Sequence, residues 1–212
     1  MDKKVGVGLV GSQFISSIHA DALSRVSDAE ILAVMSPTKG HAENFAKKFN
    51  IPNHFTDLDK MLAMPQIDMV VIGAPNYLHC EITLKIAKAG KHVVVEKPLC
   101  MNLKEADLMI DACKKANVKL MYAEELCFAP KYVRLKALLD EGALGEPVLF
   151  KQSEKHDGPH ADHFWDIERS GGGVTMDMGC HAIQFFRWLH PKKNIKSVYA
   201  QMMTSVHGDK TE

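Results

Sequence analysis

Several features that define special classes of protein are missing from this chain of 212 residues. Its 26 basic and 26 acidic residues are mixed and cancel, so an extended surface for nucleic acid or for a membrane is not expected. No apolar run is long enough to cross a bilayer, and no repeat or low-complexity linker interrupts the sequence. What remains is a globular protein of one or two domains with enough apolar residues to bury a core.

The five cysteines lack the pattern of a disulfide framework or of a metal site. They are odd in number and scattered, without a Cys-x-x-Cys pair, so reduced thiols are the simplest interpretation. The first four residues, Met-Asp-Lys-Lys, lead directly into a strand-like run, and we therefore expect no signal peptide. Both observations favour a cytoplasmic protein.

Strand-like and helix-like segments alternate over residues 1–123. Apolar runs typical of buried strands occupy residues 5–10, 29–35, 67–72, 93–95 and 118–122, and apolar residues at helical spacing lie between them. Such alternation with short loops predicts right-handed βαβ units and therefore a Rossmann-type, doubly wound parallel sheet. We predict a first α/β domain over residues 1–123.

The pattern changes after residue 123. Helical spacing covers residues 130–139 and 173–189, and strand-like runs cover residues 148–154 and 198–204. We expect residues 124–212 to form the first part of a C-terminal α+β domain with an open, mostly antiparallel sheet. Two long strands are too few for a stable sheet, so we expect the sequence to stop inside this domain.

The turn after the first strand is the candidate phosphate site. The glycines of Gly6-Val7-Gly8-Leu9-Val10-Gly11 match Gly-x-Gly-x-x-Gly literally but lie inside the strand, whereas the dinucleotide fingerprint follows a strand and opens a helix. In the register that begins at Gly11, Gln13 and Ser16 stand where glycines are expected. The helix N-terminus still offers N–H groups to an anion. This pattern alone fits either a nucleotide loop or an ordinary βα turn.

The end of the second strand bears on the choice of cofactor. A carboxylate there would bind the adenosine ribose hydroxyls and favour NAD, but this chain has Ser36. Lys39 or His41 can meet a 2′-phosphate instead. The sequence leaves NAD and NADP open, with a preference for NADP.

Two elements carry candidate catalytic side chains. The run Val93-Val94-Val95 delivers Glu96 and Lys97 to the carboxyl end of a strand, where ligands of open α/β sheets bind. Asp177 and His181 are four residues apart on a predicted helix and share one face, which Gln184 continues. The alternatives are a surface lysine at a strand end, a solvated polar helix face, or an aspartate that holds a structural histidine.

Taken together, motifs along essentially the whole chain resemble the Gfo/Idh/MocA family of nicotinamide-dependent oxidoreductases. They are Phe14-Ile15 with His19-Ala20, Pro75-Asn76-x-x-His79, Glu96-Lys97-Pro98, Gly142-x-x-Gly145, and Gly171-Gly172-Gly173-x-x-x-Asp177-x-Gly179-x-His181. Departures from the family pattern are Gln13 and Ser16 in the fingerprint, Gln184 where Asp is common, and Glu125 where Asn is often found.

The resemblance implies an NAD- or NADP-dependent oxidoreductase that transfers hydride to or from a sugar, polyol or related hydroxylated small molecule. It implies dimers or tetramers through the C-terminal sheet, and it implies the following cofactor-binding positions: Gly11, Gln13, Phe14, Ile15, Ser36, Pro75, Asn76, His79, Glu96 and Lys97.

The same resemblance implies three catalytic residues. His181 is the better general base, because an imidazole titrates near about 6.5 and a lysine near about 10.4. Asp177 would orient His181 or bind a substrate hydroxyl. Lys97 would stabilise the negative charge that develops on the reacting oxygen.

The loop over residues 155–172 is rich in His, Asp and Gly. His160 and His163, with Asp157 or Asp162, can be arranged as zinc ligands, but their spacing is not a compact metal motif and we expect no metal. We expect His160, His163, Trp165 and Gln184 to bind a sugar or polyol; the alternative is a mobile surface loop.

Two rival functions remain open. One uses the cofactor transiently, for redox-assisted elimination or glycoside cleavage. The other is a non-catalytic ligand sensor on the same fold, which Gln13 and Ser16 favour and which Lys97, Asp177 and His181 argue against.

Overall fold

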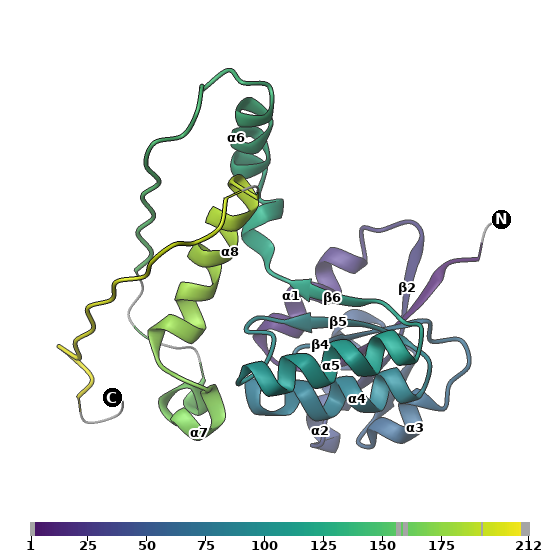
Figure 1. The fold of residues 1–212 in the computed structure, drawn as a ribbon. Coiled ribbons are helices and arrows are strands. Elements are labelled where there is room, and N and C mark those ends of the chain that lie inside the picture. The colour runs from purple at the N-terminus through teal and green to yellow at the C-terminus, as the bar shows by residue number, and fades with distance from the viewer. Residues whose placement is uncertain (1–2, 156–157, 159–160, 192, 209–212) are drawn as a thin grey trace. The chain divides into compact units, whose positions relative to one another are not determined.

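The computed structural model describes residues 3–155, 158, 161–191 and 193–208 (Figure 1). The chain forms two compact units, Met1–Ala123 and Glu124–Glu212, and each is described by itself. Within the described residues, no helix combines the length and the apolar character that crossing a bilayer would require.

Unit 1 is built on a six-stranded sheet in which every pair of neighbouring strands is parallel. Its strands are β1 (Val5–Val10), β2 (Ala29–Met35), β3 (Asn53–Phe55), β4 (Met69–Ile72), β5 (His92–Glu96) and β6 (Leu120–Ala123). The order β3-β2-β1-β4-β5-β6 reverses direction between β1 and β4, which is where doubly wound sheets bind ligands. The predicted parallel sheet is confirmed, and β3 is an added edge strand of three residues.

Helices cover both faces of this sheet. They are α1 (Phe14–Leu23), α2 (Lys39–Phe49), α3 (Leu58–Leu62), the 3-10 turn η1 (Asn76–Leu78), α4 (His79–Lys88) and α5 (Leu103–Lys115). One buried cluster joins α3, α4 and α5 to strand residues such as Val70 and Val93, and a second joins α1 and α2 to Val7 and Leu9. Figure 1 shows α4 and α5 side by side along the first of these faces. Alternate strand residues therefore point to opposite cores.

A capping box fixes the loop between β5 and α5. The Asn102 side chain accepts a hydrogen bond of 3.0 Å from the Glu105 N–H. The Glu105 carboxylate reaches back and accepts from the Met101 N–H at 3.0 Å. Because both ends of this turn are tied, the start of α5 is held a few residues beyond Pro98, and the segment that follows Lys97 is short and constrained.

The regular elements in the described part of unit 2 are all helical turns or helices. Its elements are the 3-10 turn η2 (Glu125–Phe128), α6 (Pro130–Asp140), the 3-10 turn η3 (Asp162–Trp165), α7 (Ile167–Ser170), the π-helical turn η4 (Thr175–Gly179) and α8 (Cys180–Leu189). Tyr132 of α6 packs on Phe185 of α8 with ring centroids 4.5 Å apart. This contact joins α6 to the helix that carries His181.

The two strands predicted for unit 2 do not form in the described part of the chain. Residues 148–154 and 198–204 pair with no other strand, and the predicted C-terminal sheet is not confirmed. Val148 is 98% exposed and Tyr199 is 89% exposed. Alternating apolar residues predict a strand with one buried face, but a strand is stable only when neighbouring strands satisfy its N–H and C=O groups.

Candidate functional site

The β1–α1 turn has the close approach that a dinucleotide loop needs. Gly11 has φ +108°, and a Cβ at this position would lie 2.4 Å from the Gly73 carbonyl oxygen. A Cβ on Gly11 or on Gly73 would also lie within 2.8 Å of Ser16 Oγ. The Ser16 side chain therefore occupies the space that these two glycines leave.

The polar groups around this turn fit a pyrophosphate. Ser16 is buried, and its Oγ has no hydrogen-bond partner within the described residues. Gln13 is the N-cap of α1, but its exposed side chain makes no capping hydrogen bond to the helix. A helix N-terminus without a side-chain cap, together with an unpartnered buried hydroxyl, suits an anionic ligand.

Ser36, which was predicted to lie near the adenosine ribose of the cofactor, is 4% exposed. It follows β2, and the Ser12 hydroxyl donates to the Ser36 Oγ at 3.0 Å. A hydrogen bond between two neutral hydroxyl groups therefore joins the β1–α1 turn to the β2–α2 turn. No carboxylate follows β2 at this position.

His79 joins the loops that follow β4 and β5. Its Nδ1 lies 2.9 Å from the Pro98 carbonyl oxygen and its Nε2 lies 2.8 Å from the Ala74 carbonyl oxygen. The ring is completely buried, and burial lowers the pKa of its imidazole. His79 thus holds together the two loops that carry Pro75, Asn76 and Lys97.

Glu96 fixes the backbone at Lys97. It is 6% exposed, its Oε1 lies 2.7 Å from His19 Nε2 of α1, and its Oε2 accepts from the Lys97 N–H at 2.9 Å. Glu96 therefore links α1 to the end of β5. The His19–Glu96 contact spans 77 residues of sequence, so no local pattern predicts it.

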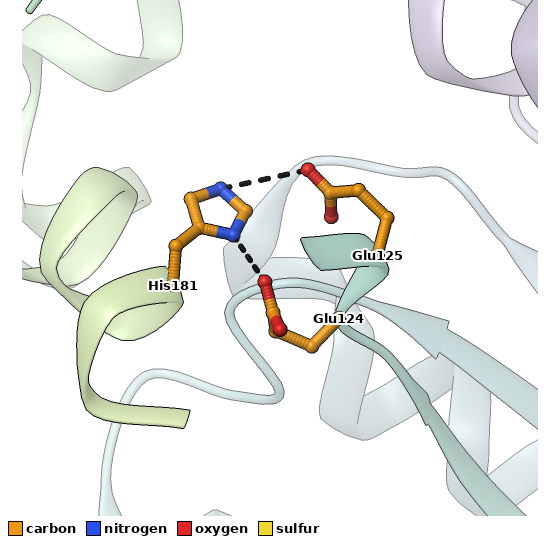
Figure 2. Close-up of side chains that lie close together, drawn as sticks. All are labelled: Glu124, Glu125 and His181. Carbon is orange, nitrogen blue, oxygen red and sulfur yellow. Dashed lines mark hydrogen bonds and ion pairs between the residues drawn. The ribbon is translucent and has the colours of Figure 1, made fainter. Parts of the chain in front are cut away.

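In unit 2, His181 meets a residue that the sequence analysis did not select. His181 on α8 is 4% exposed and its Nδ1 is hydrogen-bonded to Glu124 Oε1, where Glu124 is itself 3% exposed (Figure 2). The His181 Nε2 points toward Glu125, whose Oε1 is 3.8 Å away. The carboxylate pair that flanks the imidazole comes from the segment directly after β6, 57 residues earlier in the chain.

Asp177 lies in the π-helical turn η4, and His181 follows it in α8. The side chains of His181, Phe185 and Leu189 are buried on α8. Gln184 is half-buried on the same helix.

Two other predicted substrate residues, His163 and Trp165, lie on the 3-10 turn η3. Trp165 packs edge-on against His207 with centroids 4.8 Å apart, and His163 stacks on Phe164 at 4.2 Å. His160 and Asp157 lie outside the described residues. Within the described ranges, the one cluster of three His, Cys, Asp or Glu side chains close enough to share a metal is Glu124, Glu125 and His181.

Four of the five cysteines are buried, and their reactivity provides a test of the structure. Burial, together with Glu124 beside it, raises the pKa of the Cys127 thiol to about 11. We expect iodoacetamide at pH 8 to modify half-buried Cys180 about tenfold faster than Cys127, with the Cys127 rate rising as the pH approaches 11. Peptide mass spectrometry measures both rates; equal rates in the native protein would contradict the buried position, and the rates should converge in urea.

Comparison with known proteins decides the family. A model described as the oxidoreductase family with an NAD-binding Rossmann fold matches residues 5–124, and the GFO/IDH/MocA C-terminal domain model matches residues 132–212. The chain belongs to the GFO/IDH/MocA family. The resemblance seen in the sequence motifs is thereby confirmed over both units.

Several curated proteins are similar over most of this chain. The myo-inositol 2-dehydrogenase of Thermotoga maritima is 28% identical over 92% of the chain and 57% of its own length. The trans-1,2-dihydrobenzene-1,2-diol dehydrogenase of Xenopus laevis is 32% identical over 92% of the chain and 59% of its own length. The chain thus spans somewhat more than half the length of these relatives.

Solved structures share the fold. GenD2 from gentamicin A biosynthesis, in complex with NAD, has a TM-score of 0.80 and 28% identity, covering 89% of this chain and 54% of that one. Levoglucosan dehydrogenase in complex with NADH has a TM-score of 0.78 and 28% identity, covering 88% and 54%. Both proteins bind the cofactor class that the β1–α1 turn fits.

Proposed function

We propose that this protein is an NAD(P)-dependent oxidoreductase that transfers hydride between nicotinamide and a hydroxyl-bearing carbon of a sugar, polyol or related small molecule. The observation that carries the proposal is the buried imidazole of His181, held at Nδ1 by Glu124 in a family of oxidoreductases. Relatives named for inositol, levoglucosan and anhydrofructose support the substrate class.

Unit 1 would hold the cofactor. The residues that fit its pyrophosphate are Gly11, Ser16 and the N-terminus of α1, and Ser36 would meet the adenosine ribose. When bound, the nicotinamide supplies the hydride acceptor. The proposal includes NAD and NADP, because Ser36 gives no carboxylate to repel a 2′-phosphate and the similar structures were solved with NAD and NADH.

The protein's own residues would handle the proton. The carbon-bound hydrogen leaves as hydride, the hydroxyl proton passes to His181 Nε2, and the alcohol becomes a carbonyl. Lys97 would hydrogen-bond the reacting oxygen and stabilise its developing charge. With His181 Nδ1 held by Glu124, Asp177 is assigned to a substrate hydroxyl rather than to orienting the imidazole.

Further parts of the proposal concern the second unit and the cell. His160, His163, Trp165 and Gln184 are proposed to contact the sugar or polyol. Unit 2 is proposed to carry substrate recognition and the contacts of a homodimer or homotetramer. Reduced thiols favour a cytoplasmic location.

The test is a panel of sugars, inositols and amino-sugars supplied to the full natural chain with NAD and with NADP. We expect reduced cofactor, followed at 340 nm, to form in step with a carbonyl product. We expect His181→Ala to lower turnover by about 10²–10⁴-fold while cofactor affinity stays within about twofold, because it removes only the base.

Each rival function predicts a different result from the same panel. Substrate loss without net reduced cofactor would indicate transient redox use, as in elimination or glycoside cleavage. Ligand and cofactor binding without turnover on any substrate would indicate a sensor. Unchanged turnover in His181→Ala would remove the assignment of the base.

A further inference from the structure

We propose that Glu124 is a positioning residue that fixes the tautomer of His181, so that Nδ1 carries the ring proton and Nε2 accepts the proton of the substrate. This inference rests on the proposed function, in which His181 is the general base. It concerns a carboxylate that follows β6 and that no motif of the sequence singles out.

The hydrogen bond between the buried side chains of His181 and Glu124 determines which atom donates the proton. An ionised carboxylate can only accept, so the His181 Nδ1 that contacts Glu124 Oε1 must donate. A neutral imidazole has one N–H, and the other ring nitrogen then carries the lone pair. The contact therefore determines which nitrogen is the base.

The second carboxylate oxygen of Glu124 also accepts a hydrogen bond. The Cys127 thiol donates to Glu124 Oε2 with an Sγ–Oε2 distance of 3.6 Å. Because the pKa of Cys127 is raised to about 11, the group is a thiol at neutral pH and remains a donor. Two donors from different elements, η2 and α8, thus fix the carboxylate plane.

The Nε2 side of the His181 ring faces Glu125. Nε2 lies 3.8 Å from Glu125 Oε1, beyond hydrogen-bond range, and the Glu125 side chain is 64% exposed. An exposed carboxylate is screened by water, so Glu124 contributes more than Glu125 to stabilising the imidazolium. The titratable groups nearest to His181 in sequence are Cys180 on α8 and Asp177 on η4. The α6 residue that packs against α8 is Tyr132, through Phe185.

A metal site is the competing interpretation of the same cluster. Glu124, Glu125 and His181 are close enough to share an ion. However, Glu124 already occupies Nδ1, which leaves only Nε2 and Glu125 as ligands, whereas catalytic zinc takes about three protein ligands. The observations favour a carboxylate–imidazole pair that handles a proton.

The decisive variant is Glu124→Gln in the full natural chain. The amide has the same shape, loses the charge, and can donate to Nδ1, which would place the proton on Nε2. We expect kcat/KM to fall by about 10²-fold or more, with the acidic limb of its pH profile moved to lower pH, and cofactor affinity within about twofold. We expect Glu125→Gln to lose less than about fivefold and exposed Glu141→Gln to behave as the parent.

A second measurement keeps the inference testable even if Glu124→Gln folds poorly. The ¹⁵N shifts of the His181 ring in the unsubstituted protein report the tautomer directly, and we expect a protonated Nδ1 and an unprotonated Nε2 at neutral pH. A ring protonated on Nε2 would overturn the inference whatever the activity. So would an unshifted pH profile in folded, active Glu124→Gln. The expected tautomer in a protein without dehydrogenase activity would instead remove the proposed function alone.

Discussion

Replacing Lys97 with alanine is expected to lower turnover by about 10²–10³-fold while cofactor affinity changes by less than about twofold. The expectation follows from how the end of β5 is held. Glu96 accepts from the backbone N–H of Lys97, a bond that alanine keeps, and His79 fixes the loop beyond Pro98. The substitution therefore removes an ammonium group from a supported backbone. The loss should fall on kcat rather than on the binding of cofactor, because the ammonium acts on charge that develops during the reaction.

Steady-state kinetics and cofactor titration on the full natural chain separate these effects. Lys119→Ala is the matched control, since Lys119 is exposed and stands at the opposite end of the same sheet, before β6. It should retain parental kinetics. Equal turnover in Lys97→Ala and the parent would show that the lysine at the end of β5 is an ordinary surface lysine.

Gly11→Ala is expected to weaken cofactor binding by about 10²-fold and to lower the free energy of unfolding by about 2–4 kcal/mol. The added Cβ would lie 2.4 Å from the Gly73 carbonyl oxygen and would require φ +108°, which side chains rarely adopt. Two of the three atoms that the Cβ would meet belong to the Gly73 backbone, so relief of the clash would require the chain itself to shift. The strain therefore falls on the turn that would contact the pyrophosphate.

Urea unfolding and cofactor titration measure the two consequences. Gly40→Ala is the control, because a Cβ there meets nothing within 4 Å and the residue lies in α2, where alanine is favoured by about 0.5–1 kcal/mol. We expect this control to be neutral or slightly stabilised. A Gly11→Ala protein with parental stability and affinity would contradict the close approach at the turn.

The parts of the fold that were predictable from sequence are those set by local pattern. Strands β1 and β2 are mostly apolar runs between polar turns, and both are observed at the predicted residues. Strand β3 was missed, because three residues are too few to establish a period. The α5 cap was predictable because Asn102 and Glu105 interact within a single turn.

The parts that could not be predicted depend on contacts distant in sequence. The local sequence around Glu124 indicates only an acidic residue after a strand. The fold brings its carboxylate to His181, which lies 57 residues later in the chain. The π turn at Asp177 was not predicted either, since one widened turn leaves the apolar periodicity of α8 intact. Residues 198–204 show the reverse case. Their alternation of apolar and polar residues is a local pattern, but a strand also needs neighbouring strands from distant parts of a chain.

The contact between Ser16, Gly11 and Gly73 changes how the fingerprint of this chain should be compared with others. A position-by-position score counts Ser16 as a lost glycine. In the structure its hydroxyl fills the room left by two glycines, Gly11 and Gly73. Gly73 lies 62 residues after Gly11 and outside the motif. Replacing Ser16 alone with glycine would therefore remove the hydroxyl that fills this room and would leave a void in the turn.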